Sequence, residues 1–256
     1  MDYNGFLTKI RQIKETGYVA THRPGDTGVG KTLEDLLGIE ENNIDGPDFE
    51  IYELKSARKQ SSSMLTLFTK VPQPMGANTM LLSSFGYPER KKPKSKSTAQ
   101  EPLAPRVIVA QQEFPRAPSD NELHVTVEFG RENSVGLQLG MQSNKLVVEN
   151  SKGIPAYYEQ EYLKEAFEKK YGHKMIYVLA ENRKSRTRPE EFWYTGARLL
   201  SGFSFAGFLS LVRERVIKLD LRIGHYPDGR THDHGTGFRV LPKELPRCFA
   251  SVERIL

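Results

Sequence analysis

The chain has 256 residues, 38% of them hydrophobic and 27% charged, a balance typical of folded globular proteins that excludes a largely disordered chain. The net charge of +5 is compatible with a polyanionic partner but is also common in proteins without one. A single cysteine, Cys248, excludes an internal disulfide and fits a reducing compartment. No apolar run approaches the roughly 18 residues of a membrane span, and the mixed, polar N-terminus predicts no secretory signal.

The start of the chain predicts two helices joined by a turn. Apolar residues at helical spacing indicate a helix from Phe6 to Ile13, and a Gly-rich turn follows at residues 24–30. Thr32 is expected to cap a second, short helix that stops at Gly38.

The next segments predict strands and a loop. Turn-forming residues 42–47 precede two runs with strand character, residues 48–57 and 62–71, and the polar link between these runs predicts a hairpin. Pro, Lys and Ser dominate residues 88–106, which predicts a long, mobile, basic loop. Two interpretations of this loop stay open, a solvated linker and a contact to a DNA backbone.

The second half of the chain mixes helices with largely antiparallel strands, which predicts a mixed α/β (α+β) fold. Alternating apolar and polar residues indicate half-buried strands, and one apolar run indicates a buried strand. The expected elements are strands at residues 123–129, 135–141 and 145–150, a helix at 159–172, a buried strand at 174–181, a helix at 204–215 and a strand at 216–224.

The segment from Asp48 to Lys55 carries the most chemical information. Glu53 and Lys55 are two residues apart, so a strand places them on one face, and Asp48 can approach Glu53 across a kink. Two carboxylates can hold Mg²⁺ through hard oxygen ligands, and the ion lowers the pKa of a bound water. The lysine can orient that water and offset charge on a phosphate. As a bare pattern, the triple also fits ordinary solvent-facing ion pairs.

Residues 32–58 resemble the catalytic segment of the MvaI/BcnI family of restriction endonucleases, which are PD-(D/E)xK enzymes similar to MutH. By this resemblance, Glu34 matches a glutamate on a helix that precedes the triad. Asp48, Glu53 and Lys55 match the catalytic metal-and-water triad, with Asp48 and Glu53 as the metal ligands.

A second block, residues 218–240, resembles the DNA-reading region of the same family, and its candidate recognition residues are Asp220, Arg222, His232, His234 and Arg239. Apolar residues alternate with Asp220 and Arg222, so a strand presents these two on one face. Arginine can pair with guanine O6 and N7 and aspartate can accept from cytosine N4, so the pair suits a C·G base pair, with Arg239 as a second guanine contact. A surface salt bridge is the alternative.

The two histidines, His232 and His234, flank an aspartate, and two interpretations stay open for them. They contact DNA, or they bind a metal, while a polar turn without a ligand is the simpler alternative. Gly235 and Gly237 follow and allow close backbone approach to a ligand.

The resemblance implies a PD-(D/E)xK core with a mixed sheet and two lobes around a DNA cleft. A catalytic lobe is expected at residues 1–118 and a DNA-recognition lobe at residues 119–256. The implied activity is Mg²⁺-dependent hydrolysis of double-stranded DNA at a short CCNGG-type site, by a monomer that nicks each strand in turn and leaves 5′-phosphate and 3′-hydroxyl ends. A prokaryotic cytoplasmic enzyme is implied, with a cognate DNA methyltransferase as a functional but not a physical partner.

Residues 25–32 also match the phosphate-loop pattern G-x4-G-K-[ST], which predicts a nucleotide-binding protein as an alternative. The pattern follows a proline and not a buried strand, and the helix after it spans only about two turns, so the context argues against it. In a milder version this loop touches a DNA phosphate. Candidate DNA-backbone contacts are His22, Lys31, Arg58 and Arg230. A non-catalytic, sequence-specific DNA-binding module is the third hypothesis.

Overall fold

The computed structural model describes most of the chain. It covers residues 1–39, 48–61, 63–88, 106–113, 126–129, 133–142, 144–171, 174–185, 187–225, 230–233 and 235–256. Several predictions lie wholly or mostly outside these residues, namely the turn at 42–47, the basic loop at 88–106, the helix end at Gly172 and His234. No helix in the described part of the chain has the length and apolar character that a membrane crossing demands.

The chain divides into two compact units, each assembled from separate segments. The first unit holds residues 1–65, 167–211 and 240–256, and the second holds residues 66–166 and 212–239. The expected single boundary after residue 118 does not coincide with this division, because the chain leaves each unit and returns to it. Strand pairing between distant segments produces such a division, and local sequence patterns do not report it.

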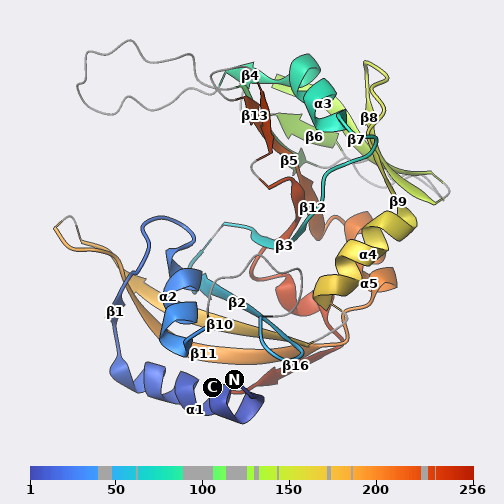
Figure 1. The fold of residues 1–256 in the computed structure, drawn as a ribbon. Helices are drawn as coiled ribbons and strands as arrows, with labels where there is room; N and C mark the ends of the chain where they lie inside the picture. Colours follow the sequence, from blue (N-terminus) through green and yellow to red (C-terminus); the bar gives the residue numbers. More distant parts are fainter. Residues whose placement is uncertain are drawn as a thin grey trace. The chain divides into compact units, whose positions relative to one another are not determined.

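A five-stranded mixed sheet forms the centre of the first unit (Figure 1). β2 runs parallel to β10, and the other pairs are antiparallel. This mixed sheet confirms the predicted mixed α/β class. The strand order is β1 (Val19–Ala20), β11 (Glu191–Ser201), β10 (Lys174–Arg183) and β2 (Tyr52–Arg58), and β16 (Ser251–Arg254) also pairs with β11.

The predicted hairpin between residues 48–57 and 62–71 is wrong. β2 pairs with β10, whereas β3 (Leu65–Thr69) joins a different sheet beside β15 (Gly237–Val240). Residues 52–54 of β2 are all buried, which is typical of a strand in a parallel pair. The predicted buried strand at 174–181 is confirmed as β10, the partner that the hairpin prediction missed.

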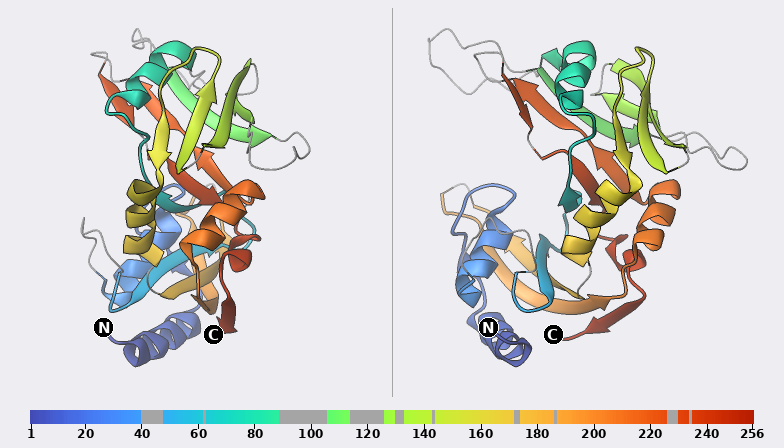
Figure 2. Two further views of the ribbon diagram at one scale, coloured as in Figure 1. Left: turned by 90° about the vertical axis from the view of Figure 1, so that its right-hand side faces the viewer. Right: turned by 45° about the vertical axis from the view of Figure 1, so that its right-hand side comes forward.

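Two helices pack on the sheet of the first unit. The first of them, α1, runs alongside the sheet in Figure 1 and in both views of Figure 2. The helices are α1 (Tyr3–Thr16) and α2 (Gly28–Leu37), and both were predicted in shorter form. Asp2 caps α1 by accepting a hydrogen bond from Gly5 N at 2.8 Å. The resulting core includes Phe6, Ile10, Leu33, Leu37, Leu54, Ile176, Val178 and Tyr194.

Helix α2 ends as predicted but begins earlier than predicted. Gly38 follows it with a φ of 73°, the left-handed conformation that glycine adopts without strain. Because α2 starts at Gly28, Thr32 lies inside the helix, where it is buried, and cannot cap it. The Thr32 hydroxyl instead accepts a hydrogen bond from His22 N at 2.9 Å.

An aromatic cluster forms a second packed region of the first unit. Its rings come from the last turn of α4 (Gln160–Tyr171), from α5 (Phe205–Arg213) and from the residues around the short helix η1 (Leu245–Cys248). Both α4 and α5 confirm predicted helices. The packed rings are those of Phe167, Tyr171, Phe203, Phe208 and Phe249.

The second unit is dominated by an eight-stranded sheet, and α3 (Ala77–Phe85) packs against β5, β13 and β14. Its pairs are antiparallel, which confirms the predicted pairing for the described residues 126–129, 133–142 and 144–150. The order is β14 (Thr231–Asp233), β13 (Arg222–His225), β5 (Arg106–Glu113), β6 (Thr126–Phe129), β7 (Asn133–Gln142), β8 (Lys145–Asn150) and β9 (Tyr157–Glu159), and β4 (Tyr87–Pro88) also pairs with β5.

The single strand predicted at residues 216–224 is divided in two. β12 (Ile217–Asp220) pairs with β15 in a three-stranded sheet that ends at β3, whereas β13 begins at Arg222 and joins the eight-stranded sheet. Leu221 between them is fully buried, so the chain changes sheet at an apolar residue. Hydrophobic alternation continues through the break, which is why the sequence reads as one strand.

Candidate functional site

Glu53 and Lys55 lie together on one face of β2, as their spacing predicts. Lys55 Nζ donates a hydrogen bond to Glu53 Oε1 at 2.5 Å, and the two side chains are 27% and 2% exposed, respectively. Tyr52 and Leu54 point to the opposite face, into the core with α1 and α2. The strand is therefore covered on both faces, and a buried carboxylate is held there against an ammonium group.

Asp48 lies just before β2 and turns back toward it. Its Oδ2 accepts a hydrogen bond from Leu54 N at 2.6 Å. The turn between them is closed by reciprocal backbone hydrogen bonds between Phe49 and Tyr52. This is the kink that the sequence predicts, and it brings Asp48 to the residue next to Glu53.

The electrostatic environment of Asp48 disfavours its charged form. Burial raises the pKa of the Asp48 carboxyl above its ordinary value, and the negative charge of Glu53 raises it further. The backbone N–H of Leu54 and the ammonium groups of Lys55 and Lys170 act in the opposite direction. Two carboxylates that repel each other in a buried site are stabilised by a cation that both can contact.

The same carboxylates fit a divalent metal ion. Glu53 Oε2 is buried and has no hydrogen-bond partner among the described residues, so its lone pairs are available to a ligand. Carboxylate oxygens are the ligands that Mg²⁺ prefers. No three His, Cys, Asp or Glu side chains within the described ranges gather closely enough to hold a metal ion alone. Asp48 and Glu53 would therefore supply two ligands, and water or phosphate oxygens the others.

Glu34 lies on α2, four residues after Gly30. A Cβ on Gly30 would lie 3.7 Å from Ser56 Oγ and 3.9 Å from Glu34 Oε1, so Gly30 lets the helix approach β2 at this point. Side chains alternate along a strand, so Ser56 points to the opposite face from Glu53 and Lys55. The Glu34 carboxylate therefore lies close to Gly30, at the point where α2 approaches Ser56 of β2.

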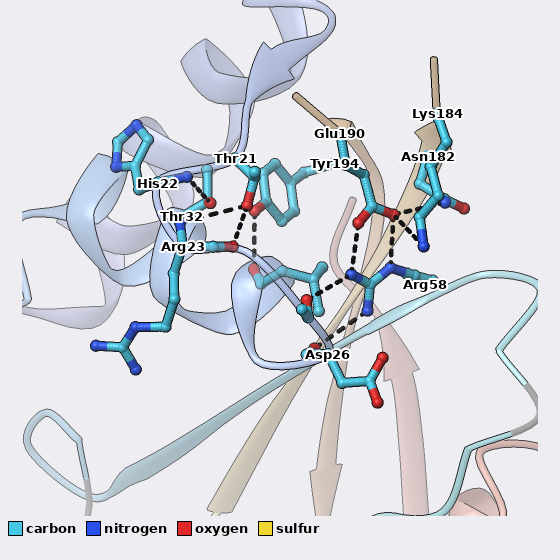
Figure 3. A network of polar contacts seen from close by, with 12 residues as sticks. Thr21, His22, Arg23, Asp26, Thr32, Arg58, Asn182, Lys184, Glu190 and Tyr194 are labelled. Atoms are coloured by element: carbon cyan, nitrogen blue, oxygen red, sulfur yellow. Dashed lines mark hydrogen bonds and ion pairs between the residues drawn. The ribbon is translucent and has the colours of Figure 1, made fainter. Parts of the chain in front are cut away.

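Arg58, at the end of β2, holds the Gly-rich segment in place. Its guanidinium donates hydrogen bonds to Gly25 O at 3.0 Å and Asp26 O at 3.1 Å, and pairs with the Glu190 carboxylate at 2.8 and 2.9 Å (Figure 3). The Arg58 guanidinium lowers the pKa of Glu190, and Glu190 raises that of Arg58. This network occupies the Arg58 guanidinium, which was predicted to contact a DNA backbone.

The segment that matches the phosphate-loop pattern is not arranged as a cradle of amide groups. α2 already begins at Gly28, inside the pattern, and Gly28 N donates to Gly25 O at 3.2 Å. A Cβ on Gly28 would overlap the carbonyl oxygen of Arg23, so this glycine is required by packing. The backbone carbonyls of residues 25 and 26 in this segment face Arg58. Carbonyl oxygens suit a guanidinium and not a phosphate.

His22 and Lys31, two further predicted DNA-backbone contacts, meet at one aspartate. Lys31 Nζ lies 2.8 Å from one oxygen of Asp35, and His22 Nδ1 lies 2.9 Å from the other. The Lys31 contact, followed by the His22 contact, lowers the pKa of Asp35. Because the His22 side chain is 42% exposed and that of Lys31 is 21% exposed, both still reach the surface.

In the second unit, Asp220 gathers two arginines. Asp220 Oδ2 lies 2.7 Å from Arg222 Nε and 2.6 Å from Arg239 Nε. The side chains of Asp220 and Arg222 are 2% and 44% exposed, so only the arginine of that pair is presented. This corrects the expectation that both face outward. The pairing forms although the chain changes sheet between the two residues.

Arg239 is engaged inside the second unit. Its side chain is 7% exposed, and its guanidinium donates to the Thr66 hydroxyl and, at 2.9 Å, to Gly235 O. Burial lowers the pKa of Arg239, and the charge of Asp220 opposes this effect. In this conformation Arg239 supports the cluster and does not stand out as a second guanine contact.

Asp233, between the two predicted histidines, organises the turn that follows β14. Its Oδ1 accepts hydrogen bonds from Gly235 N and Thr236 N, both at 2.6 Å. Its Oδ2 accepts from Asn78 Nδ2 of α3, also at 2.6 Å. The carboxylate is thus used to hold the recognition segment in shape, which argues against a metal-binding role for this aspartate.

The remaining predicted contacts are placed only in part. His232 lies on β14 and is half-buried, and Arg230 just before this strand is exposed, while His234 is outside the described residues. Gly237 does permit a close approach, but of a neighbouring strand. A Cβ there would overlap the Phe68 carbonyl oxygen of β3. The expectation that this glycine serves a ligand is therefore corrected.

Sequence reasoning missed Lys170 and Glu190. Lys170 Nζ lies 3.6 Å from Glu53 Oε2, and Glu190 anchors Arg58. Lys170 stands in a Lys-Lys pair at the end of a helix, where a cation is already favoured by the helix dipole. Nothing in the pattern marks it as a neighbour of Glu53, because the contact depends on tertiary packing.

Comparisons with known proteins identify a family and similar solved structures. The model of the MvaI/BcnI restriction endonuclease family matches residues 7–249. Similar solved structures include a complex of restriction endonuclease MvaI with cognate DNA, at 28% identity and a TM-score of 0.72, covering 100% of both chains. MvaI in the absence of DNA matches at 26% identity and a TM-score of 0.49, covering 100% of this chain and 99% of that one. The comparison with curated proteins gives no match.

Proposed function

Because the chain belongs to the MvaI/BcnI restriction endonuclease family, we propose that it is a Mg²⁺-dependent type II enzyme that cuts double-stranded DNA at a short CCNGG-type site. The proposed enzyme acts as a monomer that nicks each strand in turn and leaves 5′-phosphate and 3′-hydroxyl ends. The similarity to MvaI in complex with cognate DNA supports a duplex as the substrate. A prokaryotic cytoplasm, where a methyltransferase protects the host DNA, is the proposed setting.

The observation that carries the proposal is the state of Glu53. Its side chain is 2% exposed, one oxygen is bound by Lys55 at 2.5 Å, and the other has no hydrogen-bond partner among the described residues. Burying a carboxylate with an unsatisfied oxygen is costly in a purely structural site. A site that binds a hard cation accounts for both features, and Asp48, held beside Glu53 by the Leu54 amide at 2.6 Å, supplies the second carboxylate for that cation.

In the proposed mechanism, Asp48 and Glu53 hold the metal ion, and Lys55 acts beside them. When bound, the ion supplies a water of lowered pKa and offsets charge on the phosphate. The Leu54 amide fixes Asp48 through the 2.6 Å hydrogen bond, so the carboxylate is oriented before any ligand arrives. Lys55 orients Glu53 through the 2.5 Å contact and offers an ammonium to the attacking water and the scissile phosphate.

Recognition is proposed to centre on Arg222. It is the exposed member of the Asp220 cluster, and its planar guanidinium can bond guanine O6 and N7 in the major groove. Asp220 holds it through the 2.7 Å contact to Nε, and Arg239 in turn contacts Asp220 at 2.6 Å. His232, His234 and Arg230 stay proposed DNA contacts, and Glu34 stays a proposed contributor to catalysis from α2.

Plasmid cleavage tests the proposal directly. The wild-type protein, Lys55→Ala and Lys59→Ala are incubated with plasmid carrying CCNGG sites in Mg²⁺ or in EDTA. Lys59 is the matched control because it follows β2, pairs with Glu181 and is 47% exposed. We expect discrete fragments from the wild type and Lys59→Ala in Mg²⁺ alone, and none from Lys55→Ala. Site-specific binding without any cutting would instead indicate a DNA-binding module, and fragments from Lys55→Ala would remove this lysine from the mechanism.

A further inference from the structure

A second lysine approaches the buried carboxylate from a different part of the chain. Lys170 Nζ lies 3.6 Å from Glu53 Oε2, while Lys55 Nζ lies 2.5 Å from Oε1. The Lys170 side chain is 28% exposed, close to the 27% of Lys55. Glu53 therefore lies between two ammonium groups that both reach solvent, one from β2 and one from α4.

Helical geometry explains why Lys170 points there. Phe167, Lys170 and Tyr171 are spaced i, i+3 and i+4, so they share one face of α4. Phe167 and Tyr171 are 2% and 4% exposed, and their rings pack with Phe203 at centroid distances of 4.9 and 5.0 Å. The aromatic cluster thus fixes the rotation of the last turn, and this rotation aims Lys170 at Glu53.

The contact balances charge without using the lone pairs of Oε2. At 3.6 Å the ammonium is beyond hydrogen-bond distance, and Oε2 has no hydrogen-bond partner among the described residues. The positive charge of Lys170 is also felt at Asp48, whose pKa it lowers. Lys170 thus places a positive charge beside both carboxylates. The same charge repels any cation that binds Oε2.

We propose that Lys170 is a positioning residue that weakens metal binding at Glu53 until DNA is present, so that the ion binds tightly only beside a phosphate. This inference rests on the proposed function, because it requires the metal site at Asp48 and Glu53. A DNA phosphate brings negative charge, and this charge offsets the positive charges of both Lys170 and the ion. Linkage then requires that the ion and the duplex each strengthen the binding of the other.

Calorimetric titration with Ca²⁺, with and without a duplex carrying a CCNGG site, tests this coupling. The proteins compared are the wild type, Lys170→Met, Lys170→Arg and Lys169→Met. Methionine keeps the length of the side chain and removes its charge. Lys169 is the matched control, because it is exposed, adjacent in the same turn and equal in charge. Circular dichroism is measured on the same samples, and product formation on the same proteins in Mg²⁺.

We expect Lys170→Met to bind Ca²⁺ at least about fivefold more tightly than the wild type without DNA, and to lose most of the gain that DNA gives the wild type. Lys170→Arg and Lys169→Met should behave like the wild type. If Lys170→Met binds Ca²⁺ as the wild type does, or if Lys170→Arg shows the same gain, the inference is wrong while the proposed function stands. A wild type that neither binds a divalent ion nor cuts DNA overturns both.

Discussion

Two buried carboxylates in this protein each face two cations, and the cations differ. In the first unit, Glu53 lies between Lys55 and Lys170, and in the second unit Asp220 lies between Arg222 and Arg239. Each carboxylate is 2% exposed, and each keeps one buried oxygen without a hydrogen-bond partner among the described residues. The two lysines approach different oxygens of Glu53, whereas both arginines contact Oδ2 of Asp220.

The difference follows the chemistry that each unit is proposed to perform. A lysine ammonium is a compact point charge that suits a water and a phosphate at a hydrolytic site. An arginine guanidinium is a rigid planar fork that matches two acceptors of one guanine. We therefore infer that the lysine cluster cuts and the arginine cluster reads. Four predictions test this division, from the largest expected effect to the smallest.

Replacing the central carboxylate of the lysine cluster should have the largest effect. In Glu53→Gln the amide keeps the shape but lacks the charge that holds the ion and pairs with Lys55. Cleavage should fall by roughly 10²–10³-fold or more, the range for losing one strong electrostatic element. Single-turnover cleavage of a CCNGG duplex in Mg²⁺ measures it. Glu181→Gln, at a 39% exposed side chain that pairs with Lys59, is the control and should cut normally.

In the arginine cluster, the two cations should differ in their contribution to stability. Arg239 is 7% exposed, and removing it leaves Asp220 buried with one partner fewer, so Arg239→Met should lower the free energy of unfolding by roughly 3 kcal/mol. Arg222 is 44% exposed, and Arg222→Met should cost less than about 1 kcal/mol. Urea unfolding of both variants measures the difference. A larger loss in Arg222→Met would contradict the assignment of Arg239 as the support.

For sequence discrimination, the order of importance of the two arginines should reverse. Arg222→Met should lose about 1–3 kcal/mol of preference for the cognate duplex over one with a substituted C·G pair, the value of a bidentate guanine contact. Arg222→Lys should not restore it, because an ammonium has no planar fork. Competition binding in Ca²⁺ measures the ratio. If Arg222→Lys discriminates as well as the wild type, a positive charge alone is sufficient for recognition at this position.

The smallest expected effect concerns pH. The pKa of Asp48 in the folded, metal-free protein is raised above its ordinary value of 3.8, so its ionisation destabilises the fold as pH rises through the raised pKa. Asp48→Asn removes this charge and can still accept from Leu54 N. The variant should therefore unfold at a higher temperature than the wild type at pH 7 in EDTA. This advantage should shrink as pH falls through the raised pKa, and an advantage that grows instead would refute the assignment.

Local chemistry was predictable from the sequence, and tertiary pairing was not. The i, i+2 spacing of Glu53 and Lys55 fixes their common face, and Gly38 marks the end of α2. The partner of β2 lies more than a hundred residues away in β10, so the sequence favours the nearer, incorrect hairpin with β3.

The same reasoning explains which site residues were missed or misplaced. Lys170 reaches Glu53 only because an aromatic cluster sets the rotation of α4, and no local pattern encodes that rotation. Asp220 carries a charge and alternates with apolar residues, which predicts exposure. Its burial depends on Arg239, nineteen residues later in the chain, which supplies a second cation.

The division between cutting and reading is tested most directly by measuring binding and cleavage on the same pair of duplexes. Lys55→Ala and Arg222→Met are compared with the wild type on a CCNGG duplex and on one with a single C·G pair exchanged, with affinity taken in Ca²⁺ and rate in Mg²⁺. We predict that Lys55→Ala cuts neither duplex but keeps the wild-type ratio of affinities, whereas Arg222→Met still cuts but loses that ratio. Cleavage by Lys55→Ala, or an unchanged ratio in Arg222→Met, would contradict the account.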